Sequence, residues 1–283
     1  MRPLLTWLLC GLAGSFAVRA QPPVPTYISQ TRFNTGQDVV PVYEGWLRNS
    51  DGSFTFVFGY FNRNWKEELV IPAGLDNKLE PGPADRGQPT YFLPRRQSWI
   101  FRVPVPADWG NKELVWTLTA HGRSEKAYAT LTPEEELSER IIMTRGNLNP
   151  GEDDPNKPPV ITIDSVPSAA AGRSVSLTAQ VVDDGLPKPR IAAPAHPEAF
   201  PTAQSNRDPA SGSRGLTVTW FEYRGPAPVI FEPVGPIPVV EGRASTTASF
   251  AEAGTYILRA IANDGALSTS AEIVVTVISG SSK

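Results

Sequence analysis

The stretch VYEGWLRNSDGSFTFVFGYF, residues 42–61, decides the fold of the first half of the chain. Two aromatic runs flank Asn49–Gly52, and an Asp-Gly pair between alternating runs is a strong signal for a β-hairpin. Because side chains alternate across a strand, the second run places four aromatic rings on one face: Phe54, Phe56, Phe58 and Tyr60. The pattern predicts an antiparallel hairpin with an aromatic face turned toward a core.

Shorter runs with β-strand character follow this hairpin, and loops rich in Gly and Pro separate them. We expect strands at residues 68–71, 99–105, 114–120 and 126–131. Their spacing predicts an antiparallel β-sandwich over residues 27–146. A short helix over residues 132–144 ends this domain, because Thr132 suits the N-cap, Pro133 suits the first helical position, and acidic residues follow.

A second domain is expected at residues 160–278. Six or seven short strands with turn signals between them predict an immunoglobulin-like sandwich there. Residues 147–159 are rich in Pro, Gly, Asn and acids and form the expected linker. Residues 186–214 are rich in Pro, Ala, Ser and Asn and form an expected disordered insertion. The predicted fold class is all-β, with two β-sandwich domains.

Four motifs in the second domain carry a family resemblance: VVDDG (181–185), VTW (218–220), AGTYILR (253–259) and ANDG (262–265). Together they resemble the PKD-like or cadherin-like immunoglobulin-fold domains of bacterial exported proteins. The resemblance implies a buried Trp on the third strand, which Trp220 matches, and an adhesion, spacer or carbohydrate-proximal module. The first domain resembles uncharacterised bacterial secreted proteins.

The first twenty residues have the three parts of a secretory signal. Arg2 precedes an apolar stretch, Leu4–Ala13, and the small residue Ala20 stands at the expected cleavage point. The apolar stretch is too short to span about 30 Å of bilayer hydrocarbon. We therefore expect a secreted or periplasmic protein with no membrane span in the mature chain, with an uncleaved anchor as the alternative.

Cleavage changes the chemistry that the chain can perform. It removes Cys10, the only cysteine, so the mature protein has no disulfide and no thiolate. It also removes Arg2 and Arg19, which reduces 26 basic residues to 24 against 29 acidic ones, a net charge of −5. This mild acidity argues against a nucleic-acid partner and against basic attraction to anionic lipid.

Acidic turns form the most suggestive cluster of side chains. In an immunoglobulin-like sandwich the turns after the second strand and between the last two strands lie at one end, near the linker. That arrangement gathers six oxygen-bearing residues: Asp183, Asp184, Asn263, Asp264, Asp153 and Asp154. Hard oxygen ligands from several loops suit calcium, and the sequence suggests no other cofactor. The alternative is turn formation alone, since Asp and Asn bind their own backbone.

Tryptophans in the first domain suggest a ligand surface. Trp46, Trp99 and Trp116 lie at core positions of expected strands, whereas Trp65 and Trp109 lie in loops. The two loop residues are the better candidates for exposed rings that stack on a sugar or a peptide. Packing of a loop Trp over the end of the sandwich is the alternative.

Residues suited to catalysis are few. His121 and His196 are the only histidines, which is too few for a histidine zinc site, and no Gly-x-Ser-x-Gly precedes a helix. We predict a non-enzyme: an exported binding or scaffold protein of the bacterial cell envelope, with a protein or glycan partner outside the cytoplasm. A carbohydrate-binding accessory module is the alternative, followed by a hydrolase.

Overall fold

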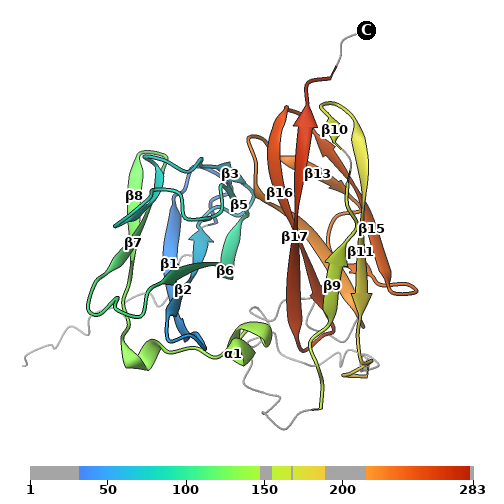
Figure 1. The fold of residues 1–283 in the computed structure, drawn as a ribbon. Coiled ribbons are helices and arrows are strands. Elements are labelled where there is room, and N and C mark those ends of the chain that lie inside the picture. Colours follow the sequence, from blue (N-terminus) through green and yellow to red (C-terminus); the bar gives the residue numbers. More distant parts are fainter. Residues whose placement is uncertain (1–31, 147–154, 167, 189–214, 281–283) are drawn as a thin grey trace, which may run out of the picture. The chain divides into compact units, whose positions relative to one another are not determined.

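The computed structural model describes residues 32–146, 155–166, 168–188 and 215–280, and most regular structure in them is β-strand (Figure 1). From Phe33 onward the chain forms one compact unit. The predicted signal peptide and most of the predicted insertion, from residue 189 to residue 214, fall outside these ranges. No helix within them has the length and hydropathy needed to cross a bilayer.

The first half of this unit contains two three-stranded antiparallel sheets, ordered β1-β2-β6 and β4-β7-β8, and a short β3-β5 ribbon. The strands are β1 (Val39–Arg48), β2 (Phe54–Asn62), β3 (Leu69–Val70), β4 (Asn77–Glu80), β5 (Tyr91–Phe92), β6 (Arg95–Val105), β7 (Leu114–Ala120) and β8 (Arg123–Ala129). Aromatic rings from β2 and β6 meet Trp116 of β7, so the two sheets pack face to face as a sandwich.

The predicted hairpin and its aromatic face are confirmed. β1 and β2 pair antiparallel from Arg48↔Phe54 outward, with a bulge between Tyr43 and Gly45. Phe58 is fully buried and stacks on Phe101, with ring centroids 5.1 Å apart. The edge-to-face pair between Phe101 and Trp116, at 4.7 Å, continues this cluster across the sandwich. Each such pair stabilises the fold by about 0.5–1.5 kcal/mol beyond the contribution of the apolar area that it buries.

The β7–β8 hairpin begins closer to its turn than the sequence suggests. β7 has its predicted bounds, whereas β8 starts at Arg123 instead of residue 126. His121 and Gly122 have φ values of 49° and 73°, which suit a tight two-residue turn. Pairing therefore starts at once, with Ala120 opposite Arg123.

The helix predicted over residues 132–144 is interrupted. The structure has a 3₁₀ turn, η1 (Pro133–Glu135), and then α1 (Glu139–Met143). Between them the chain is extended, and the Leu137 N–H donates to the Trp46 carbonyl at 2.7 Å. The edge of β1 offers this acceptor, so a backbone hydrogen bond to the sheet replaces a turn of helix.

The second half has immunoglobulin topology, which confirms that expectation. Its strands are β9 (Val160–Ile163), β10 (Ala169–Ala170), β11 (Ser174–Val182), β12 (Thr217–Arg224), β13 (Val229–Glu232), β14 (Ile237–Pro238), β15 (Arg243–Phe250), β16 (Gly254–Asn263) and β17 (Ser268–Ile278). One sheet is ordered β13-β15-β11-β9 and the other β10-β17-β16-β12-β14. With β9, β11 and β12 as strands A, B and C, these sheets are the ABED and CFG sheets of that fold. Trp220, on strand C, is buried as expected.

The described end of the predicted linker packs onto this sandwich. Asn156 is buried and its amide donates to Asp264 at 3.2 Å. The Lys157 N–H donates to Asp184 at 2.9 Å, and the Thr269 hydroxyl donates to the Pro159 carbonyl. Residues 155–159 therefore belong structurally to the second sandwich.

Trp116→Ala should lower the free energy of unfolding by about 3–5 kcal/mol, the usual range for emptying a large aromatic site. Trp116→Phe keeps much of the ring packing but removes the indole donor that Asn77 Oδ1 accepts at 3.0 Å, which costs about 1–3 kcal/mol. Urea unfolding followed by circular dichroism measures both changes. The partly exposed Trp65, changed to Phe, is the control and should stay near wild type. A wild-type midpoint for Trp116→Ala would contradict this description of the core.

Candidate functional site

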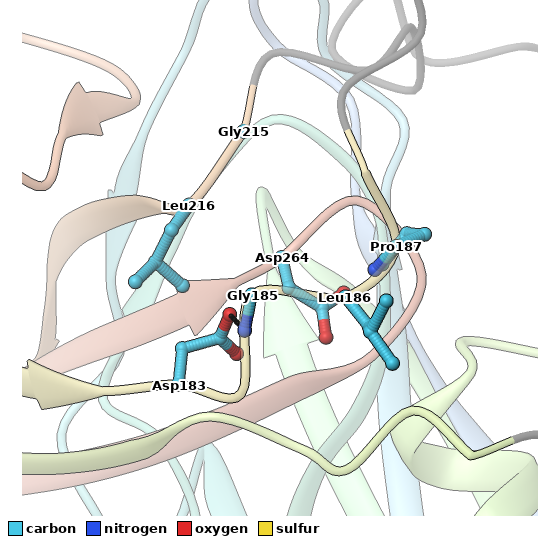
Figure 2. A pocket seen from close by; sticks show the side chains of 7 residues that line it. All are labelled: Asp183, Gly185, Leu186, Pro187, Gly215, Leu216 and Asp264. Carbon is cyan, nitrogen blue, oxygen red and sulfur yellow. Dashed lines mark hydrogen bonds between the residues drawn. The ribbon is translucent and has the colours of Figure 1, made fainter.

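The predicted acidic cluster forms in part. Asp183 and Asp184 follow β11, and Asp264 follows β16. Asp183 and Asp264 line the same small cavity of about 120 Å³, which Figure 2 shows in close-up. Two further members of the predicted set, Asp153 and Asp154, lie outside the described residues.

Turn hydrogen bonds use most of the oxygens in this cluster. The side chains of Asp183, Asp184 and Asn263 each accept from the backbone N–H two residues on, at 2.9, 3.0 and 2.8 Å. Asp264 Oδ1 accepts from the N–H groups of Ala266 and Leu267, at 2.6 and 2.7 Å. These are the Asx turns that the sequence offered as the alternative to calcium.

One carboxylate oxygen in the cluster differs from the rest. Asp183 Oδ1 is buried and has no hydrogen-bond partner. Burial, with the neighbouring Asp264 and Asp184 carboxylates, raises the pKa of Asp183. Among the described residues, no group of three or more His, Cys, Asp or Glu side chains is arranged to hold a metal ion. The described part of the cluster therefore fits turn formation better than calcium coordination.

Calcium should leave the melting temperature of the protein unchanged, because most of the oxygens that could bind it already accept turn hydrogen bonds and the described residues hold no group of three or more ligating side chains. Thermal unfolding in millimolar calcium and in a chelator, followed by circular dichroism, compares the two conditions. A higher midpoint in calcium would show instead that a complete site forms when Asp153 and Asp154 are included.

The two loop tryptophans have different surroundings. Trp65 is 39% exposed, and the Arg95 guanidinium lies 4.2 Å from its ring centroid. Trp109 is only 6% exposed, because its ring packs edge-to-face on Phe56 and its indole N–H donates to the Lys112 carbonyl at 2.7 Å. The expectation of an exposed Trp109 was therefore wrong: this loop closes over the end of the sandwich, and its ring joins the core.

Among the described residues the one histidine is His121, in the β7–β8 turn. His121 Nε2 lies 3.2 Å from the Glu67 carboxylate, and its backbone has a positive φ. This contact connects the β7–β8 turn to the loop before β3. His196 lies outside the described residues.

A buried charged side chain occupies the contact between the two hydrophobic cores. Arg259 projects from the outer face of β16 and is 9% exposed. Its guanidinium donates to the Glu272 carboxylate of β17 and to the Ile100 carbonyl of β6. It also lies 3.9 Å from the centroid of the Tyr223 ring. One side chain thus joins both sandwiches through an ion pair, a hydrogen bond and a cation–π contact.

The end of β12 makes the second part of this contact. Tyr223 belongs to the hydrophobic core of the first sandwich, and its carbonyl accepts from the Thr90 N–H at 3.2 Å. The Gly225 N–H donates to the Thr90 hydroxyl at 3.1 Å. The Arg224 guanidinium donates to Asp85 at 2.7 Å. Residues 223–225 and 85–90 are therefore docked by backbone and side-chain hydrogen bonds together. We call these two segments and Arg259 the junction.

A buried carboxyl group adjoins the junction. Glu222 is 2% exposed, and its Oε2 accepts from the Val229 N–H at 2.9 Å. Its Oε1 is buried with no hydrogen-bond partner. Burial is the main cause that raises the pKa of Glu222 to about 8, and the Glu68 charge adds to it. Strongly shifted groups of this kind mark functional or regulatory positions more often than chance.

Sequence reasoning missed both Arg259 and the adjoining Glu222, although Glu222 left a signal. Glu222 alternates with Val218 and Trp220 on the inward face of β12, where a charge is out of pattern. Arg259 alternates instead with the inward Leu258 and Ala260, so its position predicts a solvent-exposed side chain. Only the packing of the first sandwich on this face buries it.

Glu222→Gln should flatten the pH dependence of stability. The carboxyl has an ordinary pKa of 4.5 and a folded-state pKa of about 8, so between these values the folded chain keeps a proton that the unfolded chain loses. The free energy of unfolding of the wild type therefore falls as pH rises, by up to about 1.4 kcal/mol per pH unit from this group. Gln has no such proton.

Urea unfolding at pH 5, 6, 7 and 8 measures the slope. The exposed Glu134, changed to Gln, is the matched control and should keep the wild-type slope. An unchanged slope in Glu222→Gln would refute the raised pKa.

No protein-family model matches the chain, and neither does any curated protein. Solved structures do match it. A conjugative transposon lipoprotein from Bacteroides eggerthii is 10% identical, with a TM-score of 0.27, over 42% of this chain and 96% of that one. The D00-D0 domain of intimin is 11% identical, with a TM-score of 0.27, over 85% and 100%. Domains 4 and 5 of the S-layer protein SbsC are 10% identical, with a TM-score of 0.26, over 62% and 68%. Values this low support no functional argument, and the fold assignment rests on the strand order above.

Proposed function

We propose that this protein is an exported, non-catalytic binding or scaffold protein of the cell envelope, in which two β-sandwiches hold their loops at a set spacing. The junction is the observation that carries the proposal. A scaffold needs a defined distance between its binding loops, and two domains joined only by a linker move by default. Here Tyr223 of the second sandwich enters the core of the first, and Arg259 ties β16 to β6.

Export fits the way the chain is stabilised. The predicted signal peptide contains the only cysteine, so the mature protein depends on its hydrophobic cores. Those cores are substantial: the first includes Trp116, Phe58 and Phe92, and the second includes Phe250 and Tyr256. A periplasmic or secreted protein without disulfides can be stable on this basis.

A carbohydrate-binding role is the second candidate, and Trp65 favours it. Its ring is the more exposed of the two loop tryptophans, and an Arg lies over it. Because Trp109 is buried, the two cannot form a shared platform, so a sugar would stack on a single ring. Such a site predicts weak binding that Trp65→Ala abolishes.

The mature chain, used as bait on the native envelope, discriminates between these candidates. A scaffold should capture a defined protein partner, and Trp65→Ala should bind that purified partner as tightly as wild type. Recovery of no partner, together with glycan-array binding that Trp65→Ala removes, would replace the scaffold proposal by the carbohydrate one.

Arg259→Met should make the two sandwiches unfold in separate thermal transitions, which calorimetry detects. Loss of the guanidinium removes the link to Ile100 and leaves Glu272, whose side chain is 42% exposed and can be rehydrated. The cost is therefore about 1–3 kcal/mol, below that of breaking a fully buried pair. We expect one thermal transition for wild type and two for the variant. Arg243→Met, at an exposed position of β15, is the control, and a single transition in Arg259→Met would contradict the coupling.

A further inference from the structure

The Glu222 carboxyl contacts the β12–β13 loop, which adjoins the residues that dock the second sandwich on the first. Its Oε2 accepts a hydrogen bond from the Val229 N–H at 2.9 Å, at the far end of the β12–β13 loop. Its Oε1 lies against Gly225, the first residue of that loop: a Cβ added there would be 2.3 Å from this oxygen. Residues 223–225, which follow Glu222 directly, make the hydrogen bonds to residues 85–90. The carboxyl and the docking contacts thus share one short piece of chain.

The groups that face Glu222 cannot balance a charge on it. Tyr256 of β16 and Tyr91 of β5 both have raised pKa values, mainly through burial, and the nearby Glu222 contributes to each. Glu68, before β3, is an acid. The cations of this region are engaged elsewhere, since Arg224 binds Asp85 and Arg259 binds Glu272.

We propose that Glu222 is a pH-sensitive latch for the junction. With a neutral carboxyl, the β12–β13 loop stays packed and residues 223–225 remain docked on residues 85–90. With an ionised carboxyl, the loop moves so that water reaches Oε1, and the docking hydrogen bonds are lost. The latch concerns the contact between the sandwiches and requires no particular partner, so it can fail without affecting the binding proposal.

The physical reason is the cost of a buried charge without a donor. An ionised Glu222 would hold one oxygen on the Val229 N–H and leave the other against Gly225 and the Tyr256 ring. A buried carboxylate with one unsatisfied oxygen is strongly unfavourable, and exposure to water is the simplest relief. Since burial raises the pKa of this group to about 8, docking should weaken as pH rises through that value.

The test follows the full mature chain from pH 6 to pH 10. Small-angle scattering reports its radius of gyration, and circular dichroism reports the sheets. Hydrogen exchange reports on residues 85–90 and 223–229, with each rate divided by the intrinsic rate of an unstructured chain at the same pH. For wild type we expect expansion and faster exchange in both segments, with a midpoint near pH 8 and unchanged sheet content. Glu222→Gln should stay compact, with slow exchange, across the whole range.

Thr90→Val provides a reference for the open junction. It removes the hydroxyl that accepts from the Gly225 N–H while keeping the shape of the side chain, so it should exchange faster at every pH. Constant wild-type dimensions and exchange over the range would overturn the latch. So would the same midpoint in Glu222→Gln, or loss of sheet content in step with expansion, which would mean global unfolding.

Discussion

The buried guanidinium of Arg259 is the constraint on which the arrangement of this protein depends. A charge removed from water is stable only when its donors are satisfied. Here the acceptors come from two places: Glu272 on the adjacent strand and the Ile100 carbonyl of the other sandwich. Tyr223 covers the guanidinium plane. Any displacement of β6 from β16 would leave a buried donor unpaired, so this contact favours one relative placement of the strands that make it.

The junction also explains why the hydrophobic core of the first sandwich includes residues from strands of the second sandwich. Tyr223 belongs to β12, a strand of the second sandwich, yet it packs in the core of the first, and Ile257 of β16 lies against the same core. Part of the outer face of β12 and β16 is thus covered by the first sandwich, whereas Val274 and Ile278 on the outer face of β17 stay exposed. The covered patch is buried apolar area that each sandwich would lack alone.

The polar side chains at one end of the second sandwich serve its architecture. The acids after β11 and β16 bind turn N–H groups, and the segment that precedes β9 binds to the same turns through Asn156 and Lys157. Glu222 differs from these turn acids, because its buried and unsatisfied oxygen lies beside a loop that must stay docked. At such a contact a change of protonation acts directly on the packing of the two sandwiches.

Local patterns in the sequence by themselves determined the strands and turns. The hairpin at residues 42–61, β7 and the immunoglobulin order of β11, β12 and β16 follow from alternation and Asp-Gly turns, which act over a few residues. The predicted cluster of Asp183, Asp184 and Asp264 at one end of the second sandwich also followed from topology. Tertiary structure alone decided the burial of Trp109, the interruption of the final helix at Leu137 and the fate of Arg259. Each of these depends on a surface contributed by a distant segment, and periodicity along a strand cannot reveal which of its faces another sheet will cover.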